Sequence, residues 1–399
     1  MSNTTSLLFT GDIGFDKYME GRWNDSDLLA PSVRSFLNSS DHVIVNVEGP
    51  LLDRSENHSG SDTSASKISG SAAALIHAMD PGVRHFLSDI NADIWNICNN
   101  HIMDAGAEGM KSTLEYAAES GAKTLGAGMD LAGASSPVVI NEAGGIGMIG
   151  VGYQRACRKA DDVTPGCFSW SDLGLIKQRI DEINKKCKWC IVVAHAGEEF
   201  TAVPSPYTRR RYMEYLDMGA DIVVSHHPHV VNNFELIGDK AIFYSLGNFI
   251  FDTDYQRSQF CTEHGVLLKM CFDEESFSFE PFGIKVDRTN ERIVPCELPA
   301  VFCDIHASEY EKLKALGAKV LIENTKRQLK YMKPQEFLNA SEDDFRRNFY
   351  EPLRSGRVPG ETLDMQIIYP LSQEWEKEEW RTSVHTDVVE YMLKQIDTD

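Results

Sequence analysis

The chain has 399 residues, of which 42% are hydrophobic and 25% charged, a composition typical of soluble globular proteins. Its formal net charge of -21 argues against a broad nucleic-acid surface and against adsorption to an anionic membrane, because the summed field repels polyanions. An anionic substrate, whether a small molecule or an oligomer, therefore needs a local cationic site such as bound metal ions.

The N-terminal stretch 1–6 is short and polar and runs directly into an apolar segment, so no secretory signal is visible, and no window is apolar enough to span a membrane. The nine cysteines form no disulfide-scaffold pattern, and we expect them to be mostly reduced. Cys187 and Cys190 form a lone CxxC, for which a packing role is favoured over a zinc site. Together these features predict a cytoplasmic protein.

Short apolar runs alternate with glycine turns and helical patterns over most of the chain, which predicts an α/β fold. Helical spacing covers 72–91, with a break at 80–82, and also 107–120, 172–185 and 207–218. Apolar strands are expected at 6–10, 42–47, 93–98, 124–128, 138–140, 146–151, 189–194, 222–224 and 241–245, and antiparallel strands at 265–272, 276–285 and 291–298.

From residue 303 onward the sequence pattern changes to long stretches of charged residues with helical spacing, at 308–332 and 374–396. We therefore divide the chain into a domain over 1–302 and a helical C-terminal region over 303–399. The C-terminal helices either pack back on the domain or mediate homo-oligomerisation, and they carry no recognisable catalytic constellation.

Candidate metal ligands follow the predicted strands at their ends. A single acid such as Asp12 between glycines is more simply read as a turn residue, and Asn99 or Asn100 could cap the helix at 107–120. The repetition of the pattern favours ligands instead. The groups are Asp12, Glu48, Asn100 with the neighbouring His101, His195, and His227 with His229.

Mixed carboxylate, amide and imidazole ligands suit one or two borderline divalent ions such as Mn, Fe or Zn. Two ions that share a bridging carboxylate can hold a hydroxide nucleophile at neutral pH and stabilise the charge that develops in hydrolysis. His101 can donate a proton at neutral pH. Nothing resembling a phosphate loop or a nucleotide fingerprint competes with this interpretation.

Six ordered strings give the chain a family resemblance: GD at 11–12, NVEGPL at 46–51, NNHIMDAGAEG at 99–109, HAGEEF at 195–200, GADIVVSHHPHV at 219–230 and YSLGNFIFD at 244–252. Together they resemble the poly-γ-glutamate capsule biosynthesis CapA family over roughly residues 7–255. The resemblance implies a calcineurin-like metallophosphatase fold, a four-layer α/β/β/α sandwich with the metal centre at the strand ends.

Carried over position by position, the resemblance assigns a role to each group. It makes Asp12 and His229 ligands of one ion, Glu48 the bridge, and Asn100, His195 and His227 ligands of the other ion. His101 becomes the proton donor or charge stabiliser. Glu199 takes the last position of HxGxE, where contact with metal, water or substrate stays open, while His226 is expected to orient ligands or to pack.

The wider superfamily has Asp-x-His where this chain has Asp12-Ile13-Gly14. The site of the first ion therefore lacks the imidazole of that pattern. Either this ion binds weakly, or Asp16 or Glu199 completes its site, so the sequence leaves one or two ions open.

Three residues are candidate substrate contacts. Lys67 lies in the Ser/Gly-rich loop at 54–71, a composition that favours simple solvation over substrate contact. Arg209 is one of three consecutive arginines, for which a solvated helix face is the plainer interpretation. Asn248 follows a glycine in the turn that we expect to form a wall of the pocket.

These patterns predict a cytoplasmic metal-dependent hydrolase that acts on an amide, γ-glutamyl or phosphoester bond, and the family resemblance implies a role in poly-γ-glutamate or capsule metabolism. The alternative is a non-catalytic metal-binding protein that holds an anionic polymer during poly-γ-glutamate biosynthesis. His101 argues against the alternative, because a protein that only binds needs no proton donor beside its ligands.

Overall fold

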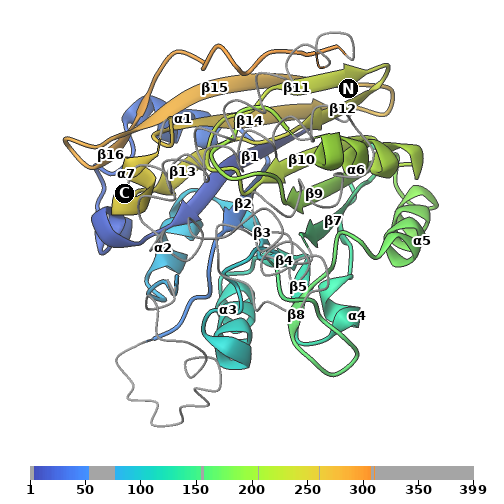
Figure 1. The fold of residues 1–399 in the computed structure, drawn as a ribbon, viewed down its shortest axis with the longest axis horizontal. Helices are drawn as coiled ribbons and strands as arrows, with labels where there is room; N and C mark the ends of the chain where they lie inside the picture. The colour runs from blue at the N-terminus through green and yellow to red at the C-terminus, as the bar shows by residue number, and fades with distance from the viewer. Residues whose placement is uncertain are drawn as a thin grey trace, which may run out of the picture.

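Two β-sheets face each other in the computed structural model, which describes residues 4–53, 77–153, 157–204, 206–259, 261–306 and 310 (Figure 1). The first sheet has eight strands, in the order β16-β15-β14-β1-β2-β3-β4, with β13 beside β1. Its strands are β1 (Thr5–Gly14), β2 (His42–Val47), β3 (Ala92–Asn96), β4 (Lys123–Leu125), β13 (Asn248–Phe251), β14 (His264–Phe272), β15 (Phe277–Asp287) and β16 (Arg292–Pro295).

The second sheet has six strands in the order β11-β12-β10-β9-β7-β6, and β5 pairs with β8 in a separate ladder. The bounds of the six strands are β6 (Val138–Ile140), β7 (Ile146–Gly152), β9 (Trp189–His195), β10 (Ile222–His226), β11 (Phe234–Ile237) and β12 (Lys240–Phe243). The short ladder consists of β5 (Ala127–Gly128) and β8 (Gly166–Cys167).

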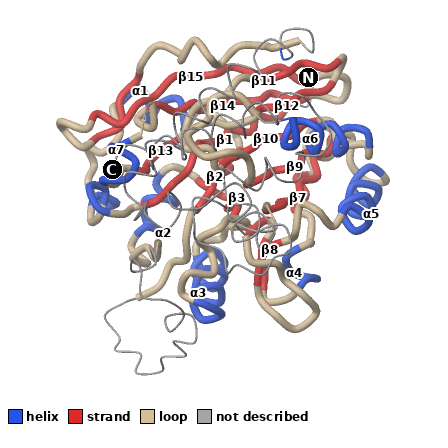
Figure 2. Tube along the Cα trace, in the orientation of Figure 1, coloured by secondary structure: helices blue, strands red, loops and turns tan. Residues whose placement is uncertain are grey.

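Helices cover the outer faces of both sheets (Figures 1 and 2). On the first sheet these helices are α1 (Pro31–Leu37), α2 (Val83–Asp89) and α3 (Gly106–Glu119), and on the second they are α5 (Leu173–Asn184) and α6 (Pro206–Asp217). The short helix α4 (Leu131–Ala134) packs on the ladder of β5 and β8, α7 (Asp254–Ser258) follows β13, and single 3-10 turns lie at Lys17–Met19 and Arg22–Asn24. Among the described residues, none of these helices combines the length and apolarity needed to cross a membrane.

Alternation of side chains along the buried strands explains the layers. Leu7 and Phe9 of β1 point into the core between the sheets, whereas Leu8 points to the core between the first sheet and helices α1, α2 and α3. Likewise Val224 of β10 faces the first sheet and Val223 faces α5 and α6. Each central strand is apolar on both faces because both faces are covered.

Parallel pairing brings the functional strand ends together. In the first sheet β1, β2, β3 and β4 run parallel, and in the second β7, β9, β10 and β12 do so. His226 stands in register with His195, and Asp12 with Asn46 and Asn248. Side chains at the carboxyl ends of neighbouring parallel strands therefore share one edge, which is where α/β proteins bind ligands.

The mixed α/β class expected from the sequence is confirmed, with several differences in detail. Residues 77–82 are not helical, so only α2 corresponds to the helix expected over 72–91, and residues 72–76 lie outside the described part of the chain. The sequence patterns did not indicate α1, β11 or β13. Residues 311–399 are not described, so the domain boundary after 302 and the C-terminal helices stay predictions.

Gly49, directly after Glu48, offers a stability test. Its φ is +122°, and a Cβ built there would lie 2.0 Å from the His77 carbonyl oxygen. We expect Gly49→Ala to lower the free energy of unfolding by about 2 kcal/mol or more, because the backbone must shift to relieve the contact. Chemical denaturation measures this loss, and Gly174→Ala, where nothing lies within 4 Å, is the control. Equal stability of the two variants would contradict the close approach.

Candidate metal centre

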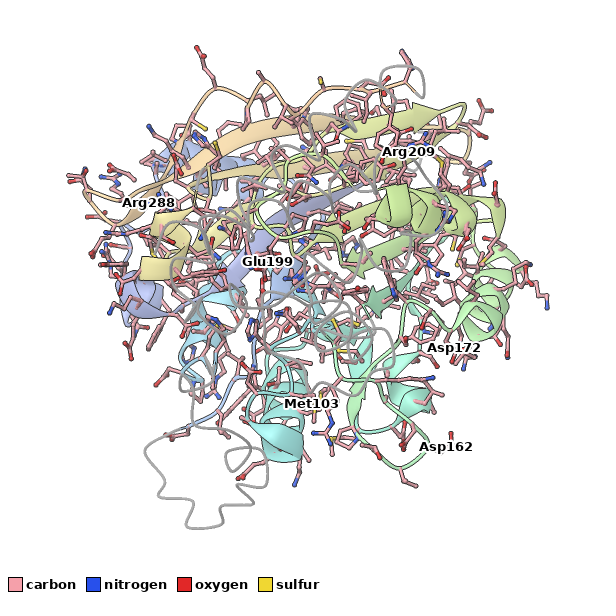
Figure 3. All side chains as sticks on the ribbon, viewed as in Figure 1. Met103, Asp162, Asp172, Glu199, Arg209 and Arg288 are labelled. Carbon is pink, nitrogen blue, oxygen red and sulfur yellow. The ribbon has the colours of Figure 1, made fainter. Side chains whose placement is uncertain are left out.

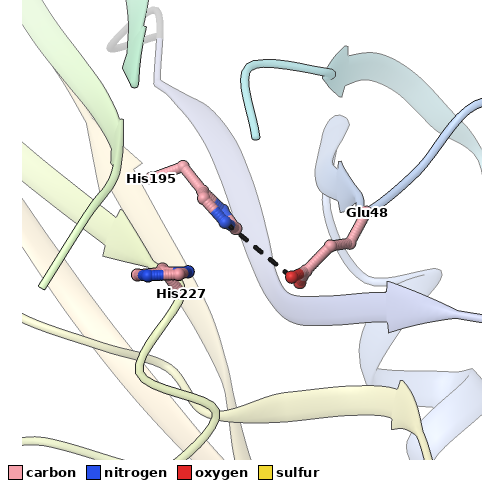
Figure 4. Close-up of side chains that lie close together, drawn as sticks. All are labelled: Glu48, His195 and His227. Carbon is pink, nitrogen blue, oxygen red and sulfur yellow. Dashed lines mark ion pairs between the residues drawn. The ribbon is translucent and has the colours of Figure 1, made fainter. Parts of the chain in front are cut away.

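Side chains from both sheets meet at the edge formed by the parallel strand ends. Glu48 follows β2, His195 ends β9, and His227 follows β10. Figure 4 shows these three side chains converging, with His195 Nε2 3.8 Å from Glu48 Oε1. Their candidate ligand atoms all lie within 4.8 Å of one another, and all three residues are fully buried. This geometry fits a divalent ion with one carboxylate and two imidazole ligands.

Asn100 adds a fourth group to this set. Its Oδ1 lies 2.8 Å from Nε2 of His195. The N-cap of α3 is Ala105, so neither Asn99 nor Asn100 caps that helix. Instead, Asn99 holds the turn, because its Nδ2 donates to the Val47 carbonyl at 2.7 Å and its Oδ1 accepts from the His101 amide at 3.2 Å.

A second group shares Glu48 and contains Asp12 and His229, again with ligand atoms within 4.8 Å of one another. His229 Nδ1 lies 3.3 Å from Asp12 Oδ2, and its Nε2 lies 3.5 Å from Glu48 Oε1. Asn46 donates to Asp12 Oδ1 at 2.9 Å and so orients this carboxylate from β2. The two groups therefore meet at Glu48, the position expected for a bridge.

The buried polar atoms of the centre are short of partners. Neither oxygen of Glu48, neither ring nitrogen of His227, nor Nδ1 of His195 has a hydrogen bond among the described residues. Buried polar atoms are almost always satisfied, and each unsatisfied one costs about 1–3 kcal/mol. Divalent ions bound here would coordinate several of these atoms, so the ligand atoms present fit the borderline divalent metals that carboxylate and imidazole ligands favour.

The electrostatics of the centre point the same way. Burial raises the pKa of Glu48 well above its usual value and lowers the pKa of His195 well below its usual value. Burial, helped by the charge of His229, lowers the pKa of His227 to about 3. Burial also opposes a charge on His229, but Glu48 and Asp12 outweigh it and raise the pKa of His229 to about 10. Without an ion, one imidazolium has to balance the carboxylates around it.

The backbone after β10 is held in an unusual conformation. His227 has φ +97° and His229 has φ +55°, a region that residues other than glycine rarely adopt. Such conformations cost about 1–3 kcal/mol each and cluster at functional sites. Here these conformations turn the imidazole of His227 toward one ligand group and that of His229, on the other side of Pro228, toward the other.

His101 and Glu199 lie beside the ligands. His101 Nδ1 binds Asp104 Oδ2 at 2.8 Å, and burial lowers the pKa of His101 although Asp104 opposes that shift. Glu199 is buried, lies at the centre of Figure 3, and adds negative charge that acts on both Glu48 and His229. The structure thus places both predicted catalytic residues near the ligand groups.

The three predicted substrate contacts are placed differently. Arg209 forms a bidentate ion pair with Glu235 at 2.7 Å and lies well apart from Glu199 in Figure 3. The Asn248 amide holds His229, with Oδ1 3.0 Å from Nδ1, and donates to the Thr262 carbonyl at 2.8 Å. Lys67 lies outside the described residues. For all three, substrate contact stays a prediction.

The sequence interpretation gave no role to Asn46 or His77, and it offered Asp16 only as a candidate ligand of the first ion. Asn46 is the one polar residue in the apolar run HVIVNV apart from its first residue, and that break in the pattern was the available signal. His77 and Asp16 form a close side-chain pair beside His101, so Asp16 is engaged with an imidazole and is not part of either ligand group. No local pattern connects residues 61 positions apart.

Fold and site together define an α/β protein with a buried carboxylate and imidazole centre suited to divalent metal ions. The family described as bacterial capsule synthesis protein PGA_cap matches residues 6–253, and the chain belongs to this family. That match covers every residue of the two ligand groups.

Two curated relatives come from Bacillus. The chain is 30% identical over 259 residues to the PGA biosynthesis protein CapA of Bacillus subtilis, covering 64% of this chain and 65% of that protein. It is 29% identical over 263 residues to the capsule biosynthesis protein CapA of Bacillus anthracis, covering 64% and 61%. The match thus spans slightly less than two thirds of either relative. Among solved structures, a hypothetical protein from Thermus thermophilus is 14% identical, with a TM-score of 0.40, over 70% of this chain and 99% of its own.

Proposed function

We propose that the chain is a metal-dependent hydrolase of the capsule synthesis family. The observation that carries the proposal is the pair of buried ligand groups that share Glu48. Both oxygens of Glu48, both ring nitrogens of His227 and Nδ1 of His195 lack hydrogen-bond partners among the described residues. A purely structural cluster would be expected to satisfy these atoms internally. In the same proposal, the helix-covered pair of sheets is the four-layer α/β/β/α sandwich of calcineurin-like metallophosphatases.

The chain's own residues divide the work in this proposal. Asn100, His195 and His227 would hold one ion, Asp12 and His229 the other, and Glu48 both. Bound ions would lower the pKa of a coordinated water and stabilise negative charge in the transition state. His101, oriented through Nδ1 by Asp104, would give a proton to the leaving group from Nε2 when its ring carries both protons, a form that Asp104 favours and burial opposes.

The substrate class that we propose is an anion with an amide, γ-glutamyl or phosphoester bond. The net charge of -21 repels anions in general, so attraction has to come from the bound ions and the local imidazoles. The names of the Bacillus relatives place those proteins in PGA or capsule biosynthesis, and we propose the same process for this chain. A cytoplasmic location and an oligomeric state stay predictions from the sequence.

Removing the metal should abolish the hydrolytic activity of the protein. We expect chelator-treated protein to lose turnover on a panel of γ-glutamyl amides and phosphoesters and to regain it with Mn²⁺ or Zn²⁺. Its melting temperature should fall and recover in parallel, because a ligand bound at 1,000 times its Kd adds about 4 kcal/mol to the free energy of unfolding.

Elemental analysis of the purified protein completes this test. Protein that binds no divalent metal after incubation with either ion would refute the proposal. Metal binding together with tight, turnover-free binding of γ-glutamyl oligomers would favour the non-catalytic alternative.

A further inference from the structure

A second imidazole lies against His101 and belongs to neither ligand group. His77 is almost completely buried, with 6% of its side chain exposed, and its ring centroid lies 4.1 Å from that of His101. Both rings use Nδ1 to contact a carboxylate, Asp16 for His77 and Asp104 for His101. Two imidazole and carboxylate pairs thus stand side by side.

Asp104 ties the two pairs together. Its Oδ2 accepts a hydrogen bond from the backbone amide of His77 at 3.0 Å and also contacts His101 Nδ1 at 2.8 Å. The carboxylate that orients His101 therefore also fixes the backbone that carries His77. The spacing of the two rings is built into the fold.

Phe251 connects this arrangement to the candidate metal centre. Its ring centroid lies 5.4 Å from that of His77 and 4.9 Å from that of His229. Gly14 makes room for it, because a Cβ at that position would lie 2.4 Å from the Phe251 ring. One aromatic ring therefore separates His77 from a candidate ligand, which puts His77 at the border of the site.

Three arginines of the described part of the chain are already engaged in ion pairs. Arg257 binds Asp252 at 2.6 Å, and Arg288 binds the other oxygen of Asp252 at 3.1 Å. Arg209 is paired with Glu235. Nearer the centre, the described carboxylates of Asp16, Asp104 and Glu199 would repel an anionic substrate. Imidazoles whose Nε2 has no partner among the described residues are then the available donors, and His77 and His101 both meet this description.

We propose that His77, held by Asp16, is a substrate-binding residue that donates a hydrogen bond from Nε2 to an anionic oxygen of the substrate beside His101. The oxygen belongs to a carboxylate or to a phosphoryl group, and both accept such charge-assisted bonds. In the protonated ring, Nδ1–H donates to Asp16 while Nε2–H donates to the substrate. This inference rests on the proposed function, since it supplies that reaction with a substrate contact.

The test is calorimetric titration of the zinc-loaded full-length chain with inorganic phosphate and, separately, with γ-glutamylglutamate. His77→Phe keeps an aromatic ring against His101 and removes both nitrogens, so we expect about tenfold weaker binding of the probe that the site recognises. Asp16→Asn should weaken binding of the same probe by a smaller factor. The control is His85→Phe, a change of the same kind at an exposed histidine of α2, which should leave both affinities unchanged.

A second measurement separates binding from a purely structural role. In protein labelled with ¹⁵N-histidine, the Nε2 resonance that is missing in His77→Phe should shift when the recognised probe is added to wild type. A structural role would lower the melting temperature of both variants without this shift. Should His77→Phe fail to fold, His77→Gln takes its place in both the titration and the assignment of the resonance, and Asp16→Asn tests the pair independently.

The outcomes distinguish the two proposals. Unchanged affinities in His77→Phe, an unmoved resonance, or a zinc-loaded wild type that binds neither probe would overturn the role of His77 and leave metal binding standing. A chain that binds no zinc refutes the proposed function. In that case the same titrations of metal-free protein still test His77, because its pair with Asp16 involves no candidate ligand.

Discussion

Replacing Glu48 with glutamine is expected to abolish metal binding at both ligand groups at once. Glu48 is the residue that the two groups share, so its loss removes a carboxylate ligand from each group. An amide oxygen is a far weaker ligand for a divalent ion than a carboxylate in the same place. Turnover should fall by at least about 100-fold, since even residues that merely orient ligands cost 10–100-fold when changed.

The measurement is metal content by elemental analysis, together with melting curves with and without Mn²⁺ or Zn²⁺. Glu48→Gln should lose the metal-dependent rise in melting temperature. Its metal-free form should unfold near metal-free wild type, because neither Glu48 oxygen accepts a hydrogen bond from a described residue and the side-chain volume is kept. A Glu48→Gln protein that still takes up two ions would contradict the shared position of this carboxylate.

Glu235→Gln is the matched control for Glu48. Glu235 is also buried, but both of its oxygens are engaged, by Arg209 at 2.7 Å and by the Tyr244 hydroxyl at 2.7 Å. Its replacement leaves a half-buried guanidinium without its charged partner, which should destabilise the protein with or without metal. Glu235→Gln should still show the rise in melting temperature that metal binding causes. The two variants thus separate loss of an ion from loss of stability.

Replacing His227 with alanine is expected to remove one ion and to reduce turnover by at least about 100-fold while leaving the fold largely intact. His227 contributes an imidazole to one ligand group alone, so the group of Asp12, Glu48 and His229 should keep its affinity. Metal titration should therefore show one fewer site than in wild type, measured by calorimetry and elemental analysis.

Two further variants make the His227 result specific. His227→Gly should be more stable than His227→Ala, because φ +97° strains alanine and suits glycine, yet it should lose the same ion. His226→Ala changes the preceding buried histidine, which lies 3.3 Å from Asp12 Oδ1 but belongs to neither ligand group. It should retain the ion that His227→Ala loses. Identical metal content in His226→Ala and His227→Ala would refute the assignment of this ligand.

Gly14 and Phe251 bear on the question of one or two ions. The ring of Phe251 fills the space beside Gly14, a residue that has no side chain to offer as a ligand, and Asp16 faces His77 instead of the ligands. The group around His229 therefore has fewer imidazoles than the group around His195 and His227. We expect the latter to bind its ion more tightly, and the stepwise titrations of wild type and His227→Ala test that order.

The sequence by itself indicated the ligand groups, because its information was local. Each candidate ligand directly follows or ends an apolar run, and parallel strands bring their carboxyl ends to one edge, so Glu48, His195 and His227 could be expected to meet. The family match over residues 6–253 agrees with the motifs that suggested it. Asp12 differs slightly, since β1 continues through Gly14 and carries it inside the strand.

Tertiary structure alone decided which polar groups pair across long separations. Arg209 looked like an exposed cation on a helix, but folding places Glu235 against it and uses its charge within the protein. His77 carried no motif, yet the fold sets it between Asp16 and His101. Periodicity reports which face of its own element a residue occupies, whereas these partners come from other elements whose approach depends on how the two sheets and their connections pack.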